Sequence, residues 1–93
     1  MDCIIVTRHK ALAEYMLAEG IAPPGTPVVP HAKPFHVQGA HVYGVLPLRL
    51  AALAFAVTEV PLRLGDEDLN REINLERLRQ IAGPPVTYHV QRL

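Results

Sequence analysis

The sequence predicts an α/β domain with an open, mainly parallel sheet of about five strands and about three helices. Residues 3–6 form a continuous apolar run, which is typical of a strand covered on both faces in a parallel sheet. A helical pattern follows after a short polar turn, and this opens a βα unit. Strand-like and helix-like segments then continue in the order β-α-β-β-α-β-α-β, and right-handed crossovers would place the helices on the sheet faces.

The first helix is predicted over residues 11–19, and Gly20 supplies its C-terminal stop. Residues 21–34 hold so many prolines that they exclude a helix and leave room only for a short strand at Val28-Val29. The helix prediction rests on positions spaced by three and four, which are Leu12, Tyr15, Met16 and Glu19.

The middle of the chain predicts another buried strand over residues 41–45. Pro47 suits the first position of a helix, which the apolar residues 48–57 extend. Residues 58–64 alternate polar and apolar side chains, so they predict a further strand, and Pro61 places it at an edge or ends its pairing early.

The last third begins with an acidic turn over residues 65–70. Asn74 is the expected N-cap of a helix over residues 75–82, which Gly83 and the following prolines end. Residues 86–91 alternate again and predict the closing strand. No internal repeat or linker divides the sequence, so residues 1–93 are expected to form a single domain.

Composition limits the classes of partner. Nine basic and nine acidic residues give a net charge of zero, which disfavours a protein that coats long nucleic acid. A nucleic-acid ligand should therefore be small. The single cysteine excludes an intrachain disulfide, and no apolar run is long enough for a membrane. We expect a cytoplasmic protein without a cofactor, and its thin core of aliphatic side chains favours a homodimer.

The first candidate site follows the first strand. Thr7, Arg8, His9 and Lys10 place a hydroxyl, a guanidinium, an imidazole and an ammonium on consecutive residues. Ligands of open parallel sheets bind beyond the carboxyl ends of the strands, near helix N-termini that favour anions. Arg and Lys can hold a phosphate, and His can transfer a proton near neutral pH. The alternative is a solvated turn in which Thr7 caps the helix.

Two further segments could bind a ligand. Gly44 permits close backbone approach at a strand end, and the following residues include Leu46 and Pro47. Arg49 is the one charge on an apolar helix, so it either reaches the ligand or extends along the helix to solvent. Arg71 could meet a second phosphate while Glu72 orients it, and salt bridging at a helix terminus is the alternative.

Metal and carboxylate sites are less favoured. His31, His36 and His41 recur at intervals of five, but a proline and a glycine interrupt the segment, so no metal site is predicted. The carboxylates of residues 66–68 are expected to form a solvated acidic loop. No glycine-rich nucleotide motif, phosphate loop or nucleophile elbow is present in the sequence.

Several short motifs together resemble the sixteenth member of the Csx series, a CRISPR-associated family found beside type III effectors. The resemblance runs almost from end to end. It is carried by Val6-Thr7-Arg8-His9, Gly20, Gly44-Val45-Leu46-Pro47-Leu48, Leu50-Ala51-Ala52, Asn70-Arg71-Glu72-Ile73 and Tyr88-His89-Val90-Gln91-Arg92.

The resemblance implies a Rossmann-like (CARF-like) fold and a ring nuclease that opens cyclic tetra-adenylate, which switches off the antiviral response. It also implies a ligand site at Thr7 to His9 and Gly44 to Pro47. Arg49 stands where the family often has His, so phosphate binding rather than catalysis is expected of it.

A mechanism follows that needs no metal, because the ribose 2′-hydroxyl of RNA can attack the adjacent phosphate. His9 would assist proton transfer, while Arg8 and Lys10 would stabilise charge on the phosphorus oxygens. Two alternatives stay open. The protein could sequester the cyclic oligonucleotide without cutting it, or it could be a regulatory interaction domain with no nucleotide ligand.

Overall fold

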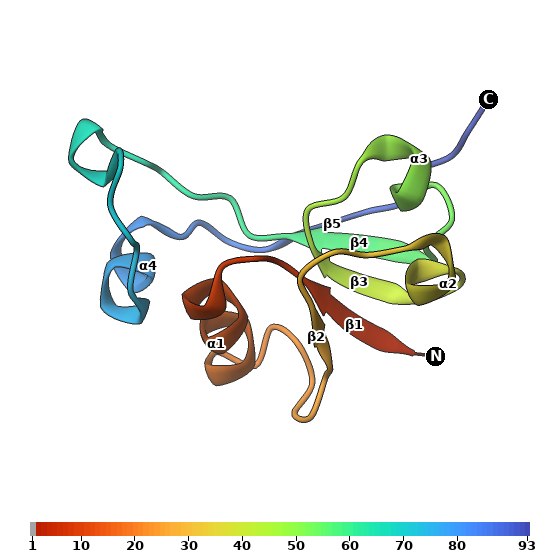
Figure 1. The fold of residues 1–93 in the computed structure, drawn as a ribbon, viewed down its shortest axis with the longest axis horizontal. Coiled ribbons are helices and arrows are strands. Elements are labelled where there is room, and N and C mark those ends of the chain that lie inside the picture. Colours follow the sequence, from red (N-terminus) through yellow and green to blue (C-terminus); the bar gives the residue numbers. More distant parts are fainter. Residues whose placement is uncertain (1) are drawn as a thin grey trace.

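The computed structural model describes residues 2–93 and confirms the α/β class. Its five-stranded sheet has the order β2-β1-β3-β4-β5 (Figure 1). The first four strands are parallel, and the edge strand β5 is antiparallel to β4. The strands are β1 (Cys3–Val6), β2 (Val28–Val29), β3 (His41–Gly44), β4 (Ala56–Glu59) and β5 (Val86–Tyr88).

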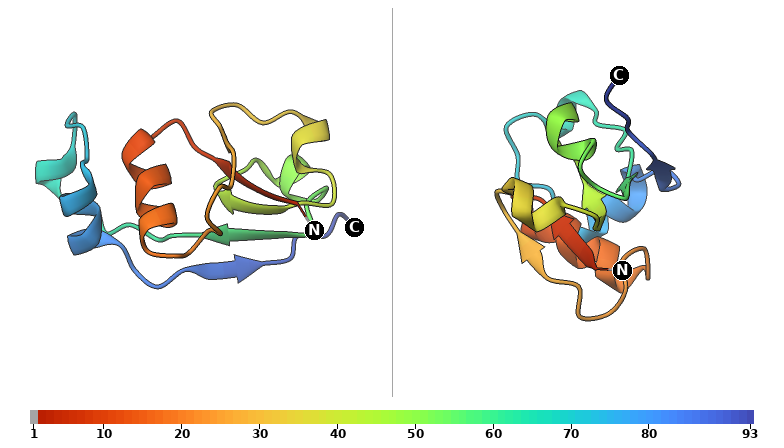
Figure 2. Two further views of the ribbon diagram at one scale, coloured as in Figure 1. Left: turned by 90° about the horizontal axis from the view of Figure 1, so that it is seen from below. Right: turned by 90° about the vertical axis from the view of Figure 1, so that its right-hand side faces the viewer.

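Helices lie on both faces of the sheet, and a further helix lies beyond it (Figure 2). They are α1 (Lys10–Ala18), α2 (Pro34–Val37), α3 (Leu48–Ala51) and α4 (Leu75–Ile81), with a 3₁₀ turn η1 (Asp66–Asp68). None of the helices in residues 2–93 is long and apolar enough to cross a membrane.

The core has two parts because successive residues of a strand point to opposite faces. Ile4 and Val6 of β1 pack in the cluster that contains residues of α2 and α3. Ile5 is fully buried on the other face, against Ala13 and Met16 of α1. The prediction that the first strand is covered on both faces is therefore confirmed.

The predicted helix over residues 48–57 is wrong in its second half. Helix α3 ends at Ala51, a turn follows, and β4 begins at Ala56. Val57 is buried and pairs with Val42, so the sheet gains a central strand from the apolar run. The predicted strand over residues 58–64 correspondingly ends its regular pairing at Glu59, before Pro61.

The sequence does not predict helix α2, because the series of prolines that ends at Pro34 disfavours a helix. Pro34 stands at the start of α2, where a missing amide hydrogen costs no helical hydrogen bond. The backbone N–H of Lys33 donates to Nδ1 of His36 at 2.8 Å, which closes the first turn. At the C-terminus the closing strand is shorter than predicted and ends at Tyr88.

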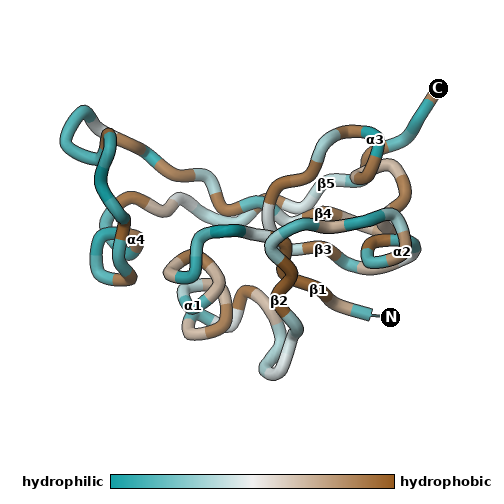
Figure 3. Tube along the Cα trace, viewed as in Figure 1, coloured by the Kyte–Doolittle hydropathy of each residue, from teal (hydrophilic) through white to brown (hydrophobic). Residues whose placement is uncertain are grey.

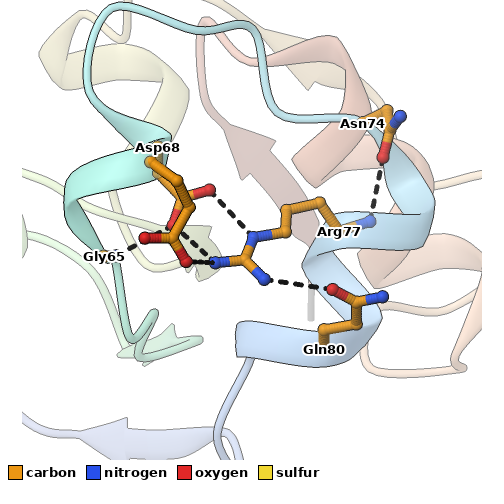
Figure 4. Close-up of polar contacts among 6 residues, drawn as sticks. Gly65, Asp68, Asn74, Arg77 and Gln80 are labelled. Carbon is orange, nitrogen blue, oxygen red and sulfur yellow. Dashed lines mark hydrogen bonds and ion pairs between the residues drawn. The ribbon is translucent and has the colours of Figure 1, made fainter.

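The segment between β4 and β5 extends beyond the sheet, and its helix α4 packs beside α1 (Figures 1 and 2). Asn74 caps α4 as predicted, since its Oδ1 accepts from the backbone N–H of Arg77 at 2.9 Å. The acidic turn is not simply solvated. Arg77 donates to both carboxylate oxygens of Asp68, at 2.8 and 2.9 Å, and to Glu67 at 2.8 Å (Figure 4).

These contacts make the stability of the segment depend on pH in the acidic range. The hydrogen bonds from Arg77, and next the one from the backbone N–H of Gly65, lower the pKa of Asp68 to about 2. A carboxyl whose pKa is lower in the folded than in the unfolded state stabilises the fold above its unfolded pKa. That stabilisation is lost as the pH falls from about 4 to about 2.

We therefore predict that Asp68→Asn flattens the acid limb of the stability curve. Thermal unfolding should be followed across this pH window. The wild type should lose stability steeply as the pH falls. The variant should be less stable than the wild type at neutral pH and should lose less stability across the window. Glu76→Gln, on α4 next to Arg77 but outside these contacts, is the matched control. Parallel wild-type and Asp68→Asn curves would mean that Asp68 is not the titrating group.

Candidate functional site

The carboxyl ends of β1, β2 and β3 meet at one edge of the sheet, because these neighbouring strands are parallel. Three loops leave from this edge: residues 7–9 after β1, residues 30–33 after β2, and residues 45–47 after β3. The trace changes there from the apolar β1 to a hydrophilic turn before α1 (Figure 3). The predicted location of the site, at the strand ends, therefore corresponds to a real junction of loops.

Gly44 makes this junction compact. It pairs with Val6 in the sheet and has a φ of +134°, a value that L side chains rarely adopt. A Cβ at this position would overlap the carbonyl oxygen of Val6. Gly44 thus lets the ends of β1 and β3 lie close together, which brings the loops that follow them side by side.

These loops enclose a pocket of about 250 Å³, which we call the arginine pocket. Arg8 comes from the first loop, His31 from the second, and Arg49 from the start of α3. The other residues that line the pocket are apolar: Val6, Pro30, Ala32, Val45, Leu46, Pro47 and Leu50. Two arginines and a histidine thus line one small hollow.

Arg8 is held in place by His31. Its Nη2 lies 3.1 Å from Nδ1 of His31. A guanidinium can only donate, so Nδ1 is the acceptor and a neutral His31 carries its proton on Nε2. Both side chains are exposed, which leaves the remaining donors of Arg8 accessible to a ligand. No ion pair among residues 2–93 engages Arg8 or Arg49.

The other members of the predicted cationic turn do not all face this pocket. Thr7 accepts from the backbone N–H of His9 at 3.1 Å, so it closes the turn. The N-cap of α1 is His9, without a side-chain hydrogen bond to the helix, and not Thr7 as the alternative reading of the turn supposed. Lys10 lines a neighbouring hollow of about 400 Å³ together with Thr7 and Arg8.

His9 and Arg71 lie together elsewhere. They line a third hollow, of about 240 Å³, which we call the leucine pocket. Its other lining residues are Leu12, Leu62, Leu64, Asp68, Ile73 and Leu78. Neither Arg71 nor Glu72 takes part in an ion pair among residues 2–93, so the salt bridging considered for them is absent there, and Arg77 holds the acidic turn instead.

The structure therefore brings Arg8, Leu46, Pro47 and Arg49 into one pocket and leaves His9 and Arg71 in another. It adds His31, which the sequence interpretation regarded only as a possible metal ligand. The three histidines considered for a metal have separate partners: His31 contacts Arg8, His36 contacts Lys33, and His41 contacts Thr58. No group of three potential metal ligands occurs among the described residues.

Comparison with known proteins gives one match. Residues 4–91 match the family described as "Putative CRISPR-associated protein (Cas_VVA1548)". No curated protein and no solved structure matches the chain. Because the match spans almost all of the sequence, from β1 to just past β5, this chain belongs to the CRISPR-associated family Cas_VVA1548.

Proposed function

We propose that this protein is a metal-independent ring nuclease that binds and opens a cyclic oligoadenylate, cyclic tetra-adenylate being the first candidate. The observation that carries the proposal is the convergence of Arg8, His31 and Arg49 on one pocket in a protein of zero net charge. A local cationic pocket in a protein with no excess of basic residues suits a small phosphodiester better than a long one. Membership of a CRISPR-associated family and the resemblance to the sixteenth Csx member agree with this ligand.

The reaction is an attack by the ribose 2′-hydroxyl on the adjacent phosphorus. The bond from phosphorus to the 5′-oxygen breaks, the 2′-hydroxyl loses its proton, and the leaving 5′-oxygen gains one. The product is a linear oligonucleotide with a 2′,3′-cyclic phosphate at one end and a 5′-hydroxyl at the other. Arg8 and Arg49 would stabilise the charge that builds on the non-bridging oxygens.

Proton transfer needs an imidazole close to that phosphate. The sequence suggested His9, and its role in proton transfer stays a prediction. The contact between Arg8 and His31 favours His31 as the base, because Nδ1 of His31 is unprotonated and faces the guanidinium that would hold the phosphate. When Arg8 donates to a phosphate oxygen instead, this nitrogen is free to accept the proton of the 2′-hydroxyl.

The size of the arginine pocket supports the homodimer expected from the sequence. About 250 Å³ falls below the roughly 300–1,000 Å³ of pockets that enclose a whole small ligand. A ring of four nucleotides would need more than one such pocket. Two copies related by a two-fold axis would present the pocket twice to a ring that shares this symmetry, and titration should then give one ring per two chains.

The test is a time course of purified protein with radiolabelled cyclic tetra-adenylate in EDTA, resolved by chromatography. Linear product with a 2′,3′-cyclic phosphate end is the expected result. Unchanged ring that is retained by the protein in a native gel would identify a sequestering protein. If the ring is neither cleaved nor retained, the cyclic oligonucleotide is not the ligand, and a small interaction domain is the reading that stays.

A further inference from the structure

We infer that the leucine pocket binds the purine base of a nucleotide whose phosphate occupies the arginine pocket. This inference rests on the proposed function and assigns a ligand to a second, separate hollow. It is carried by the size and lining of the pocket, by two exposed side chains in that lining, His9 and Arg71, and by the position of His9 next to Arg8 in the chain.

The pocket has an apolar lining from three parts of the fold. Leu12 comes from α1, Leu62 and Leu64 follow β4, and Leu78 comes from α4. Leu78 is fully buried, whereas Leu64 is 57% exposed. Helix α1 packs beside α4 (Figure 2), and residues of both helices line the hollow. At about 240 Å³ it suits a planar base rather than a complete nucleotide.

His9 and Arg71 supply the side chains that a base needs. Unstacked bases of RNA commonly stack on imidazole rings and on guanidinium planes, and both types of group line this one pocket. Both residues are exposed, and no ion pair among residues 2–93 engages either of them. Both side chains are thus accessible to a ligand in a pocket whose other lining is mainly apolar.

The loop that carries Arg71 is anchored on both sides. Before it, η1 is held by the hydrogen bonds of Arg77 to Asp68 (Figure 4), and after it, Asn74 caps α4. Asn70 adopts a φ of +59°, a left-handed conformation that Asn tolerates, and Arg71 follows it directly. The carboxylate of Asp68 is engaged by Arg77, so it does not oppose an anionic ligand as a free charge.

The two pockets share one turn of backbone. Arg8 lines the arginine pocket, and the next residue, His9, lines the leucine pocket. Consecutive Cα atoms are about 3.8 Å apart, so groups held by these two residues can belong to one nucleotide or to neighbours in one ring. A ring with a phosphate on Arg8 would thereby place a base at His9. Purines, with their larger apolar faces, should bind there better than pyrimidines.

The test uses a cyclic tetranucleotide in which 2-aminopurine, whose fluorescence changes on stacking, replaces adenine. Wild-type protein should bind it with a change in fluorescence. His9→Ala and Arg71→Ala should each weaken binding roughly tenfold and reduce that change at saturation, since base stacking accounts for about this loss on alanine substitution. His89→Ala and Arg79→Ala are matched controls, because both residues are exposed and line neither pocket.

The outcomes separate this inference from the proposed function. If His9→Ala and Arg71→Ala bind with wild-type affinity and fluorescence while Arg8→Ala loses binding, the base site is wrong and the phosphate site stands. If wild-type protein does not bind the ring, both fail. Because His9 and Arg71 are exposed, neither variant should lower the melting temperature, and a thermal melt checks this.

Discussion

Replacing Arg8 by alanine should lower kcat/KM for opening of cyclic tetra-adenylate by roughly 100- to 1,000-fold. Loss of one donor that stabilises charge in a transition state typically has an effect of about this size. Arg8 combines an open pocket, a hydrogen bond to His31 and no competing carboxylate among the ion pairs of residues 2–93. Its loss would remove both the phosphate contact and the contact that orients the imidazole.

Arg8→Lys separates charge from geometry. It keeps one positive charge but loses the planar fork, so it should recover only part of the lost activity. Arg63→Ala is the control for nonspecific electrostatics, because Arg63 is exposed and lines none of the three pockets described above. Wild-type kinetics in Arg8→Ala would exclude the arginine pocket as the place where the ring is cut.

Gly44→Ala should destabilise the fold by roughly 3 kcal/mol or more. The added methyl group would overlap the carbonyl oxygen of Val6, and the φ of +134° is unfavourable for alanine. Backbone strain and overpacking each typically cost about 1–3 kcal/mol. For a domain of this size, a loss of about 3 kcal/mol lowers the melting temperature by roughly 15 °C, which calorimetry would measure.

Gly39→Ala isolates the conformational part of this effect. Gly39 also has a positive φ, +68°, but no atom lies within 4 Å of the position of its Cβ. It should therefore lose only about 1–2 kcal/mol. If both variants melt at the same temperature, the close approach of β1 and β3 at Gly44 is not what limits substitution there.

The fold could be predicted where local pattern and global pairing agree. The run of residues 3–6, the Asn74 cap and the proline-bounded strand at Val28-Val29 all appear as expected. The prediction was wrong where an apolar run is compatible with both a helix and a strand. Residues 50–57 could continue a helix, but the nonlocal pairing of Val57 with Val42 decides in favour of β4, and no local pattern reveals that pairing.

Of the candidate site, only its place at the strand ends follows from the sequence. Parallel strands place their carboxyl ends at one edge, and this indicated the loops at residues 7–10 and 44–47. The directions of consecutive side chains in a turn depend on backbone angles that the sequence does not reveal, so Arg8 and His9 could not be assigned to different pockets. His31 was missed because its place beside Arg8 depends on the pairing of β2 with β1. Its position two residues after the predicted strand at Val28-Val29 was the available signal.

The central claim is that a cyclic oligoadenylate binds at the strand ends through Arg8, His31 and Arg49. The most direct measurement is a two-dimensional ¹H–¹⁵N NMR titration with a 2′-fluoro analogue of cyclic tetra-adenylate, which lacks the attacking hydroxyl and so stays intact. The account predicts shifts of the amide signals of residues 7–10, 31–32, 45–46 and 48–49, and small changes in α2. Unchanged spectra, or shifts confined to the opposite edge of the sheet, would contradict it.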